Sequence, residues 1–407
     1  MRLEAPPGTH DILPREQPSW ERALGTAEEL LRLYGYRRIQ TPGFEDTSLF
    51  ARTSGEGSDV VQKEMYTFED RGRRSLTLRP EGTAPICRAY VEHGFHREPQ
   101  PVKAYTIAPM YRYSRPQRGR YREHWQLSVE AIGSSDPAVD AEIVQLYDEL
   151  LRRLGVTGYR LEFNSIGDRE CRPAYLERLT AWLDEHDSAL DDEARQKRAT
   201  SPLRVFDVKS KRVLEALTEA PTIGDSLCVA CREHFESVRA YLDALGVRYE
   251  LAPRLVRGLD YYTRTAFEFM DEAIGAQSSI CGGGRYDYLV EEIGGPPTPG
   301  IGFGAGIERL LLSLGDTEEE TSGIDVFFAV ASDASRAEVL SVMAELRRRG
   351  RACDTDYAGR SAKGQMTQAG RLGAHLVVLA GPDGMAARRR GEDDVPVADA
   401  DGIEALL

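Results

Sequence analysis

The residues best suited to chemistry in this sequence are arginines gathered between Ala108 and Gly133. No carboxylate interrupts the chain from Pro99 to Arg122, and the arginines in this interval are Arg112, Arg115, Arg118, Arg120 and Arg122. A guanidinium group stays charged at ordinary pH and can hold phosphate with two parallel hydrogen bonds. The stretch therefore predicts a polyanion site, although a solvated arginine face has the same composition.

Strand-like segments flank these arginines. APMYRY and HWQLSVEAIG carry aromatic and β-branched residues in near alternation, and RPQRGR between them holds the proline and glycine that turns use. The pattern predicts an antiparallel hairpin that carries a long basic loop.

Five motifs occur in an order typical of one enzyme family. They are LRPEGTA (Leu78–Ala84), the arginine hairpin, LVRGLDYYTRTAFE (Leu255–Glu268), GGGRYDYL (Gly282–Leu289) and GFGAGIERL (Gly302–Leu310). The set resembles histidyl-tRNA synthetases, which are class II aminoacyl-tRNA synthetases. The similarity runs from PPGTHDILP near the N-terminus to GRSAKGQMTQAGRLGAHLVVLAG near the C-terminus. It implies activation of histidine by ATP to histidyl-adenylate, followed by transfer to tRNA(His).

The resemblance also implies a fold and a domain organisation. We expect an α+β catalytic domain built on an antiparallel sheet over residues 1–320, with a helical insertion at about 167–246. An α/β anticodon-binding domain is expected over residues 324–407, shortened at its C-terminus after Gly381. DTEEETSG (Asp316–Gly323) is typical of a linker between the two domains.

Residue roles follow from the same resemblance. Arg112 and Arg257 match positions that hold the substrate carboxylate and the α-phosphate, and Arg309 matches the position facing the γ-phosphate. Mg²⁺ is implied on the phosphate oxygens of ATP, and no protein metal ligands are assigned. Any one of these arginines could instead form a surface ion pair.

The amino acid histidine needs groups that pair with its α-ammonium and with both ring nitrogens. Glu81 and Thr83 match the ammonium-binding positions, although both could simply cap a helix. The other matching positions are Glu130 and Tyr262 for the imidazole, and Gln126 and Tyr286 for further contacts. A carboxylate opposite an imidazole predicts binding that depends on pH near neutrality.

The loop of the hairpin is expected to meet the acceptor end of the tRNA. The candidate contacts are Arg115, Gln117, Arg120 and Arg122. One residue departs from the class II pattern, because Ser114 stands where a glutamate usually contacts the adenine amino group.

Several elements must position these residues. Residues 16–36 predict an amphipathic helix, which the resemblance places at a homodimer interface, although it could be a plain packing helix. Asp136 and Pro137 predict the start of a helix that runs to Leu154. Tyr261 and Tyr262 are expected on opposite faces of one strand, so that only Tyr262 faces the pocket. Alternate glycines from Gly300 to Gly306 leave one strand face bare, so that a flat ring or a backbone can lie close.

Composition narrows the class of protein. At 407 residues the chain is long enough for two or three domains, and its net charge of −14 argues against a nonspecific nucleic-acid coat. No apolar run approaches the roughly 20 residues of a membrane span, and the N-terminus lacks a signal sequence, so we expect a cytoplasmic protein. CVAC (Cys228–Cys231) has a metal-like spacing, but further ligands from Cys171 or His234 require the fold to bring them back. Two reduced thiols are the simpler interpretation.

Two other functions remain open. A synthetase-like regulatory subunit of ATP phosphoribosyltransferase would bind histidine without needing the basic loop or the C-terminal domain. An inactive RNA-binding scaffold should have lost one of Arg112, Arg257 and Arg309, and all three are present.

Overall fold

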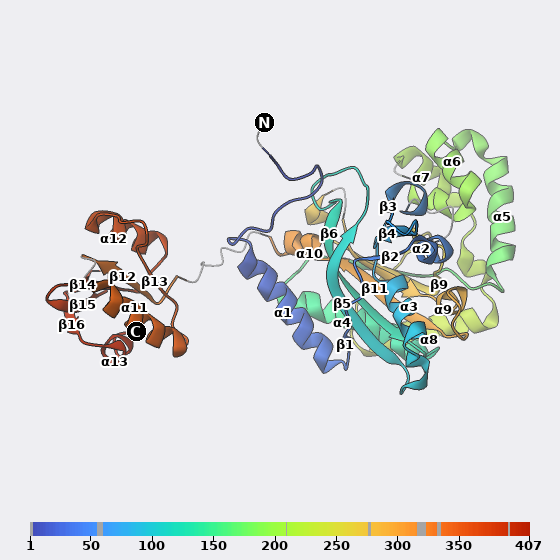
Figure 1. The fold of residues 1–407 in the computed structure, drawn as a ribbon. Helices are drawn as coiled ribbons and strands as arrows, with labels where there is room; N and C mark the ends of the chain where they lie inside the picture. The colour runs from blue at the N-terminus through green and yellow to red at the C-terminus, as the bar shows by residue number, and fades with distance from the viewer. Residues whose placement is uncertain are drawn as a thin grey trace. The chain divides into compact units, whose positions relative to one another are not determined.

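The computed structural model describes residues 3–54, 60–208, 210–275, 278–315, 323–331, 335–389 and 391–407. The chain divides into two compact units, Met1–Thr317 and Glu318–Leu407 (Figure 1). Most of the expected linker, residues 316–322, lies outside the described residues. Within the described ranges, no helix combines the length and apolar character needed to cross a membrane.

An eight-stranded sheet forms the centre of the first unit, with the strand order β1-β5-β6-β11-β10-β9-β7-β8. Neighbouring strands are antiparallel except β1 with β5 and β7 with β8. The strands are β1 (Arg37–Arg38), β5 (Val102–Tyr111), β6 (Glu123–Ile132), β7 (Arg160–Ser165), β8 (Glu250–Leu251), β9 (Thr263–Met270), β10 (Ser279–Arg285) and β11 (Gly300–Gly306). The mainly antiparallel sheet confirms the predicted α+β class.

A separate three-stranded sheet lies earlier in the chain, with the order β2-β4-β3. Its strands are β2 (Phe44–Asp46), β3 (Tyr66–Glu69) and β4 (Ser75–Leu78). The helix α2 (Thr47–Ser54) follows β2, and α3 (Thr83–Glu92) follows β4 by way of Glu81. This connection delivers LRPEGTA to the edge of the pocket described below.

Long helices cover one face of the main sheet (Figure 1). They are α1 (Gln17–Leu33), α4 (Pro137–Leu154), α8 (Val229–Ala244) and α10 (Ile307–Leu314). As predicted, α4 begins after Asp136, whose side chain accepts the backbone N–H of Ala138 at 2.9 Å. The apolar residues of α1 are buried in the same core, so this helix has a packing role within its own chain.

The opposite face of the sheet is built from the alternate residues of the same strands. On β6, Leu127 and Val129 enter the helix-covered core, while Gln126 and Glu130 point to the other side. There a side chain on any of several glycines would overlap a neighbouring residue; the pairs are Gly302 with Glu130, Gly282 with Arg257, Gly300 with Tyr286 and Gly304 with Gln126. The bare strand face is thus filled by the protein's own polar side chains.

The helical insertion has a core of its own. It contains α5 (Arg172–Glu185), α6 (Asp192–Thr200) and α7 (Lys211–Ala216), joined by 3₁₀ turns, and it buries Tyr175, Leu179, Leu183, Val205 and Val213. The chain returns through α8, which begins in this core with Cys231 and ends in the core of the main sheet with Val238 and Leu242. This helix therefore joins the insertion to the main sheet.

The second unit is an α/β domain with a five-stranded sheet in the order β13-β12-β14-β15-β16. Its elements are β12 (Val326–Val330), α11 (Arg336–Arg348), β13 (Cys353–Thr355), α12 (Ala362–Arg371), β14 (Leu376–Gly381), β15 (Gly384–Arg388), β16 (Val395–Val397) and α13 (Ala400–Glu404). β12 is parallel to β13 and β14, as the alternation of strands and helices predicted. After Gly381 the chain forms two antiparallel strands and a helix, and the shortening expected there stays a prediction.

Candidate active site

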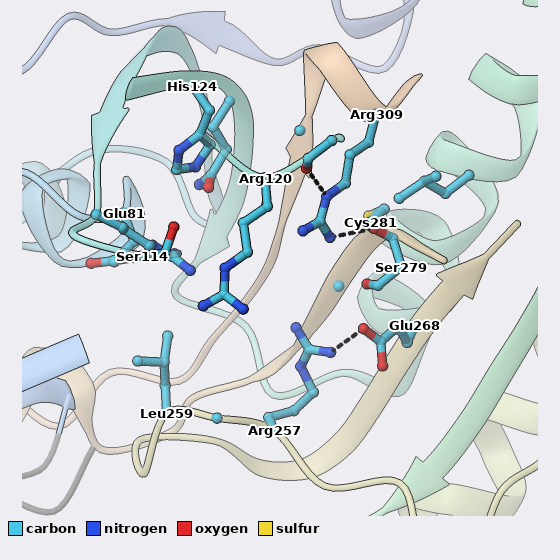
Figure 2. Close-up of a pocket in the computed structure, with 18 of the residues that line it drawn as sticks. Glu81, Ser114, Arg120, His124, Arg257, Leu259, Glu268, Ser279, Cys281 and Arg309 are labelled. Carbon is cyan, nitrogen blue, oxygen red and sulfur yellow. Dashed lines mark hydrogen bonds and ion pairs between the residues drawn. The ribbon is translucent and has the colours of Figure 1, made fainter. Parts of the chain in front are cut away.

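A cavity of about 430 Å³ opens on the polar face of the main sheet. Arg112 and Arg120 reach it from the hairpin loop, Arg257 from the segment before β9, and Arg309 from the first turn of α10. Figure 2 shows Arg120, Arg257 and Arg309 extending toward the same hollow. The three arginines singled out in the sequence, Arg112, Arg257 and Arg309, therefore line one cavity.

Each of these arginines is held in place by the protein. Arg112 Nε donates to the carbonyl of Pro80 at 2.7 Å. Arg309 donates to the carbonyls of Gly119 and Ser279, both at 2.7 Å, and Arg257 lies 3.3 Å from Glu268 (Figure 2). Anchored guanidinium groups need no reorganisation when charge develops in front of them, which is the arrangement that electrostatic catalysis requires.

Positive charge is crowded in this cavity. Burial, and then the charges of Arg112 and Arg120, lower the pKa of Arg309. Burial, and then the charges of Arg112, Arg309 and Arg120, lower the pKa of His124 to about 3, so its ring is neutral at physiological pH. Glu268 and Glu64 pair with Arg257 and Arg120, at 3.3 and 2.5 Å. An anionic ligand would relieve the remaining repulsion, which favours a polyphosphate occupant.

Glu81 has two roles in the structure. Its carboxylate accepts the backbone N–H groups of Thr83 and Ala84 at 2.7 and 2.8 Å, and thereby caps the start of α3. It also lines the cavity, and burial raises its pKa. The hydrogen bonds of Glu81 thus agree with the helix-capping alternative. Its carboxylate nevertheless lies next to any ligand in the cavity.

Glu130 and Tyr286 lie behind the cavity wall, unlike the other candidate histidine-binding residues. Glu130 is fully buried and accepts hydrogen bonds from Thr83 Oγ1 and Tyr286 OH, both at 2.6 Å. Burial raises the pKa of Glu130 to about 8. Thr83, Gln126 and Tyr262 line the cavity with Glu81. A ligand in the cavity therefore meets Glu130 through the hydroxyl of Thr83.

The expectation for the two adjacent tyrosines was wrong. Tyr261 and Tyr262 precede β9, which begins at Thr263, so strand alternation does not apply to them. Their rings lie 4.5 Å apart and both line the cavity. A turn can direct consecutive side chains to one side, whereas a strand cannot.

The predicted hairpin is present, with β5 and β6 antiparallel and the arginines in its loop. The four residues expected to contact tRNA lie in different environments in the structure. Arg120 points into the cavity, Arg115 and Gln117 are exposed, and Arg122 lies 4.0 Å over the ring of Tyr113. Of the four, only Arg115 and Gln117 are exposed.

Sequence reasoning missed several cavity residues. His124 precedes Gln126 by two positions on β6, so strand periodicity could have placed it on the same face. Burial raises the pKa of Glu308 to about 7, and its carboxylate accepts the backbone N–H of Trp125 at 2.8 Å. Asp207 enters from the insertion, and no sequence signal points to it. Burial raises the pKa of Asp207 to about 6.

Ser114, the departure from the class II pattern, also lines the cavity. Its hydroxyl is buried and has no hydrogen-bond partner among the residues that the structure describes. A neutral donor and acceptor thus faces the cavity where the usual pattern has a carboxylate.

Comparison with known proteins identifies the family. Residues 8–310 match the family model for histidyl-tRNA synthetase. Histidine--tRNA ligase of Desulforamulus reducens is 50% identical over 94% of this chain and 92% of its own length, and that of Moorella thermoacetica is 49% identical over 100% and 96%. The crystal structure of apo S. aureus histidyl-tRNA synthetase superimposes with a TM-score of 0.82 at 36% identity, covering 99% of both chains. The chain belongs to the histidyl-tRNA synthetase family.

Proposed function

We propose that this protein is a histidine--tRNA ligase, which joins histidine to ATP as histidyl-adenylate and then transfers the histidyl group to tRNA(His). The observation that carries the proposal is the set of anchored arginines around one cavity whose other wall is polar and leads to a buried carboxylate. The relatives that bear this name match the chain over nearly its whole length. A regulatory subunit that binds only histidine, or an inactive scaffold, would not need four arginines around one cavity.

The first step needs charge neutralisation more than proton transfer, because the histidine carboxylate is itself the nucleophile. Arg112 and Arg257 line the cavity from different segments, the hairpin and the segment before β9, and would hold the carboxylate and the α-phosphate. Arg309 would receive the γ-phosphate. These contacts bring two anions together and stabilise the extra charge on the pentavalent phosphorus.

ATP enters such reactions as its magnesium complex. Glu268 is the cavity carboxylate beside Arg257, and the phosphates of ATP would supply most of the other ligands of the magnesium ion. The described carboxylates of the cavity therefore fit an ion shared with ATP better than a site closed by protein ligands alone. Glu268 would hold the ion, which would neutralise phosphate charge when bound.

Selection of histidine would depend on the wall formed by Glu81, Thr83, Gln126 and Tyr262, with Glu130 and Tyr286 behind it. Glu81 offers a carboxylate to the α-ammonium, and Thr83 transmits the charge state of Glu130 to the cavity. A polar wall would reject an amino acid that lacks ring nitrogens, because such a ligand could not supply the hydrogen-bond partners that the wall requires.

We place the enzyme in the cytoplasm as a homodimer. Phe44 and Phe68 of the small sheet remain 50% and 43% exposed, with their rings 6.1 Å apart. This apolar pair gives a second copy a surface to cover.

The proposed function is tested by histidine-dependent exchange of pyrophosphate into ATP, followed by charging of tRNA(His) with and without its extra 5′ guanosine. We expect exchange to require histidine and charging to be faster with the guanosine. Exchange without charging would point to an adenylate-forming protein of another kind. Histidine binding with neither activity would support the regulatory-subunit alternative.

The exposed loop residue Gln117 separates the two steps of the reaction. Gln117→Ala should lower the rate of tRNA charging about tenfold and leave pyrophosphate exchange within about twofold of the wild type, because its side chain lies outside the cavity. Both rates are measured on one preparation, with Gln62→Ala as an exposed control. An equal loss in both steps would remove Gln117 from the tRNA interface.

A further inference from the structure

Four side chains with metal-binding atoms meet where the helical insertion joins the catalytic sheet. Asp168 and Cys171 follow β7, while Cys228 and Cys231 lie at the start of α8. One ligand atom from each lies within 4.8 Å of the other three. The fold thus brings Cys171 back to the CVAC motif, and the fourth member is an aspartate. His234, the other candidate ligand, instead lies 2.9 Å from Asp140.

The dimensions of this Asp-Cys₃ cluster fit a tetrahedral ion. Ligand atoms around zinc, at about 2.3 Å for sulfur and about 2.0 Å for oxygen, lie roughly 3.3–3.8 Å from one another. Asp168 Oδ1 and Cys171 Sγ are 3.5 Å apart. The 4.8 Å limit on the other pairs needs only a small contraction of side chains.

The backbone around Cys171 is shaped for a sulfur ligand. The N–H of Asp168 points at Cys171 Sγ at 3.4 Å, and this contact fixes the position of the sulfur. Gly167 has a φ of +63°, and a side chain there would lie 2.7 Å from the same sulfur. The thiol of Cys171 therefore packs directly against the backbone of Gly167. The same turn directs the carboxylate of Asp168 toward this thiol.

Positive groups surround the cluster and can balance the charge of its ligands. Cys171 is the N-cap of α5 and Cys228 is the N-cap of α8, so the positive ends of two helices meet at the cluster. Arg264 lies 3.5 Å from Asp168 Oδ2. These charges offset the net negative charge that three thiolates and a carboxylate leave on a bound divalent ion.

Thiolates in a closed four-ligand set select zinc among the common divalent ions of cells, since magnesium and calcium prefer oxygen. Asp168, Cys171 and Cys231 are nearly inaccessible, at 5%, 5% and 0% exposure, and Cys228 is half-buried. A buried set without an open position is typical of a structural site.

We propose that Asp168, Cys171, Cys228 and Cys231 hold one structural zinc ion that clamps the base of the helical insertion. The ion joins the segment where the chain leaves the catalytic sheet to the helix by which it returns. The insertion buries a small core of its own, and domains of this size commonly depend on a metal or a disulfide.

The clamp is connected to the active site. Arg172, the residue after Cys171, donates to the carbonyls of Gly167 and Tyr262 at 3.2 and 2.6 Å. Tyr262 lines the cavity, so the position of its backbone depends on the turn that carries two of the ligands. Loss of the ion should therefore disturb histidine binding as well as the stability of the insertion.

The test is the metal content of the full-length protein, made with zinc in the medium and purified under reducing conditions without chelator. Elemental mass spectrometry is expected to find about one zinc per chain, and cobalt exchange should give the intense near-ultraviolet absorption of thiolate ligands. Cys171→Ser/Cys231→Ser should lower the zinc content at least about tenfold. Cys353→Ser, in the second unit, removes a buried thiol outside the cluster and should retain the ion.

A single-ligand variant tests the oxygen ligand, and its melting temperature is measured as well, because Asp168 Oδ1 also accepts the backbone N–H groups of Glu170 and Cys171. Asp168→Ala removes the oxygen ligand but leaves three thiolates, so zinc affinity should fall about tenfold or more while the cobalt–thiolate absorption remains. Wild-type protein that carries no zinc and takes up none from a zinc-loaded dye would overturn the proposal. A disulfide among these cysteines in the freshly purified protein would also overturn it, as would full zinc content in the double cysteine variant.

Discussion

Arg112→Ala is expected to lower kcat/KM for histidine-dependent pyrophosphate exchange by about a thousandfold. The guanidinium of Arg112 lines the cavity and is fixed by its bond to the carbonyl of Pro80 at 2.7 Å. Removing it leaves the substrate carboxylate and the α-phosphate facing each other with less compensating charge. The loss should appear mainly in kcat, because the opposing charge is greatest in the transition state.

The matched control is Arg118→Ala, since Arg118 lies in the same loop and is exposed. It should leave pyrophosphate exchange within about twofold of the wild type, because an exposed charge outside the cavity is screened by solvent. Melting temperatures of both variants separate a catalytic loss from unfolding. A well-folded Arg112→Ala variant with near-normal exchange would falsify the assignment of Arg112 to the activation step.

Glu130→Gln is expected to lower kcat/KM for histidine by about a hundredfold or more, mainly through KM. Glu130 is buried behind Thr83, and its pKa of about 8 leaves it largely protonated at neutral pH before histidine binds. Free imidazole has a pKa of about 6.5. Between these two values Glu130 and the histidine ring together hold one proton, and the hydroxyl of Thr83 would link the ring to the carboxyl group.

The wild-type affinity for histidine should therefore be greatest between about pH 6.5 and about pH 8, and should fall on either side. Glu130→Gln should flatten the alkaline side of this profile, because the variant has no carboxyl group to titrate. Equilibrium binding of histidine across the pH range gives the profile. An unchanged profile in the variant would mean that another group sets the pH dependence.

The same substitution should stabilise the ligand-free protein. A buried carboxyl whose pKa is raised from 4.5 to about 8 favours folding most below the lower value, where it is protonated in both states. This contribution to the free energy of unfolding, on the order of a few kcal/mol, is lost as the pH rises through about 8. Chemical denaturation should show a smaller fall in the free energy of unfolding for Glu130→Gln than for the wild type. Glu123→Gln, at a half-buried position on the same strand, is the control.

Much of the fold could be predicted because its signals are local. The cap at Asp136 sets the start of α4, and alternation of apolar residues sets β5 and β6. The five motifs place the chain in its family, because each motif is a short run of residues. Such runs, and their order along the chain, can be recognised without knowledge of the fold. The types of residue also determined the chemistry, since clustered arginines suit phosphates in any fold.

The tertiary structure decided where those residues act. It turned Arg120 into the cavity, placed Glu130 behind Thr83, brought Asp207 from the insertion, and put Tyr261 beside Tyr262. It also joined Asp168 and Cys171 to two cysteines more than fifty residues away along the chain. These outcomes depend on burial and on contacts between distant segments, which determine both the direction of a side chain and its pKa. A sequence determines which groups are available, whereas the packing of the whole chain determines which of them meet.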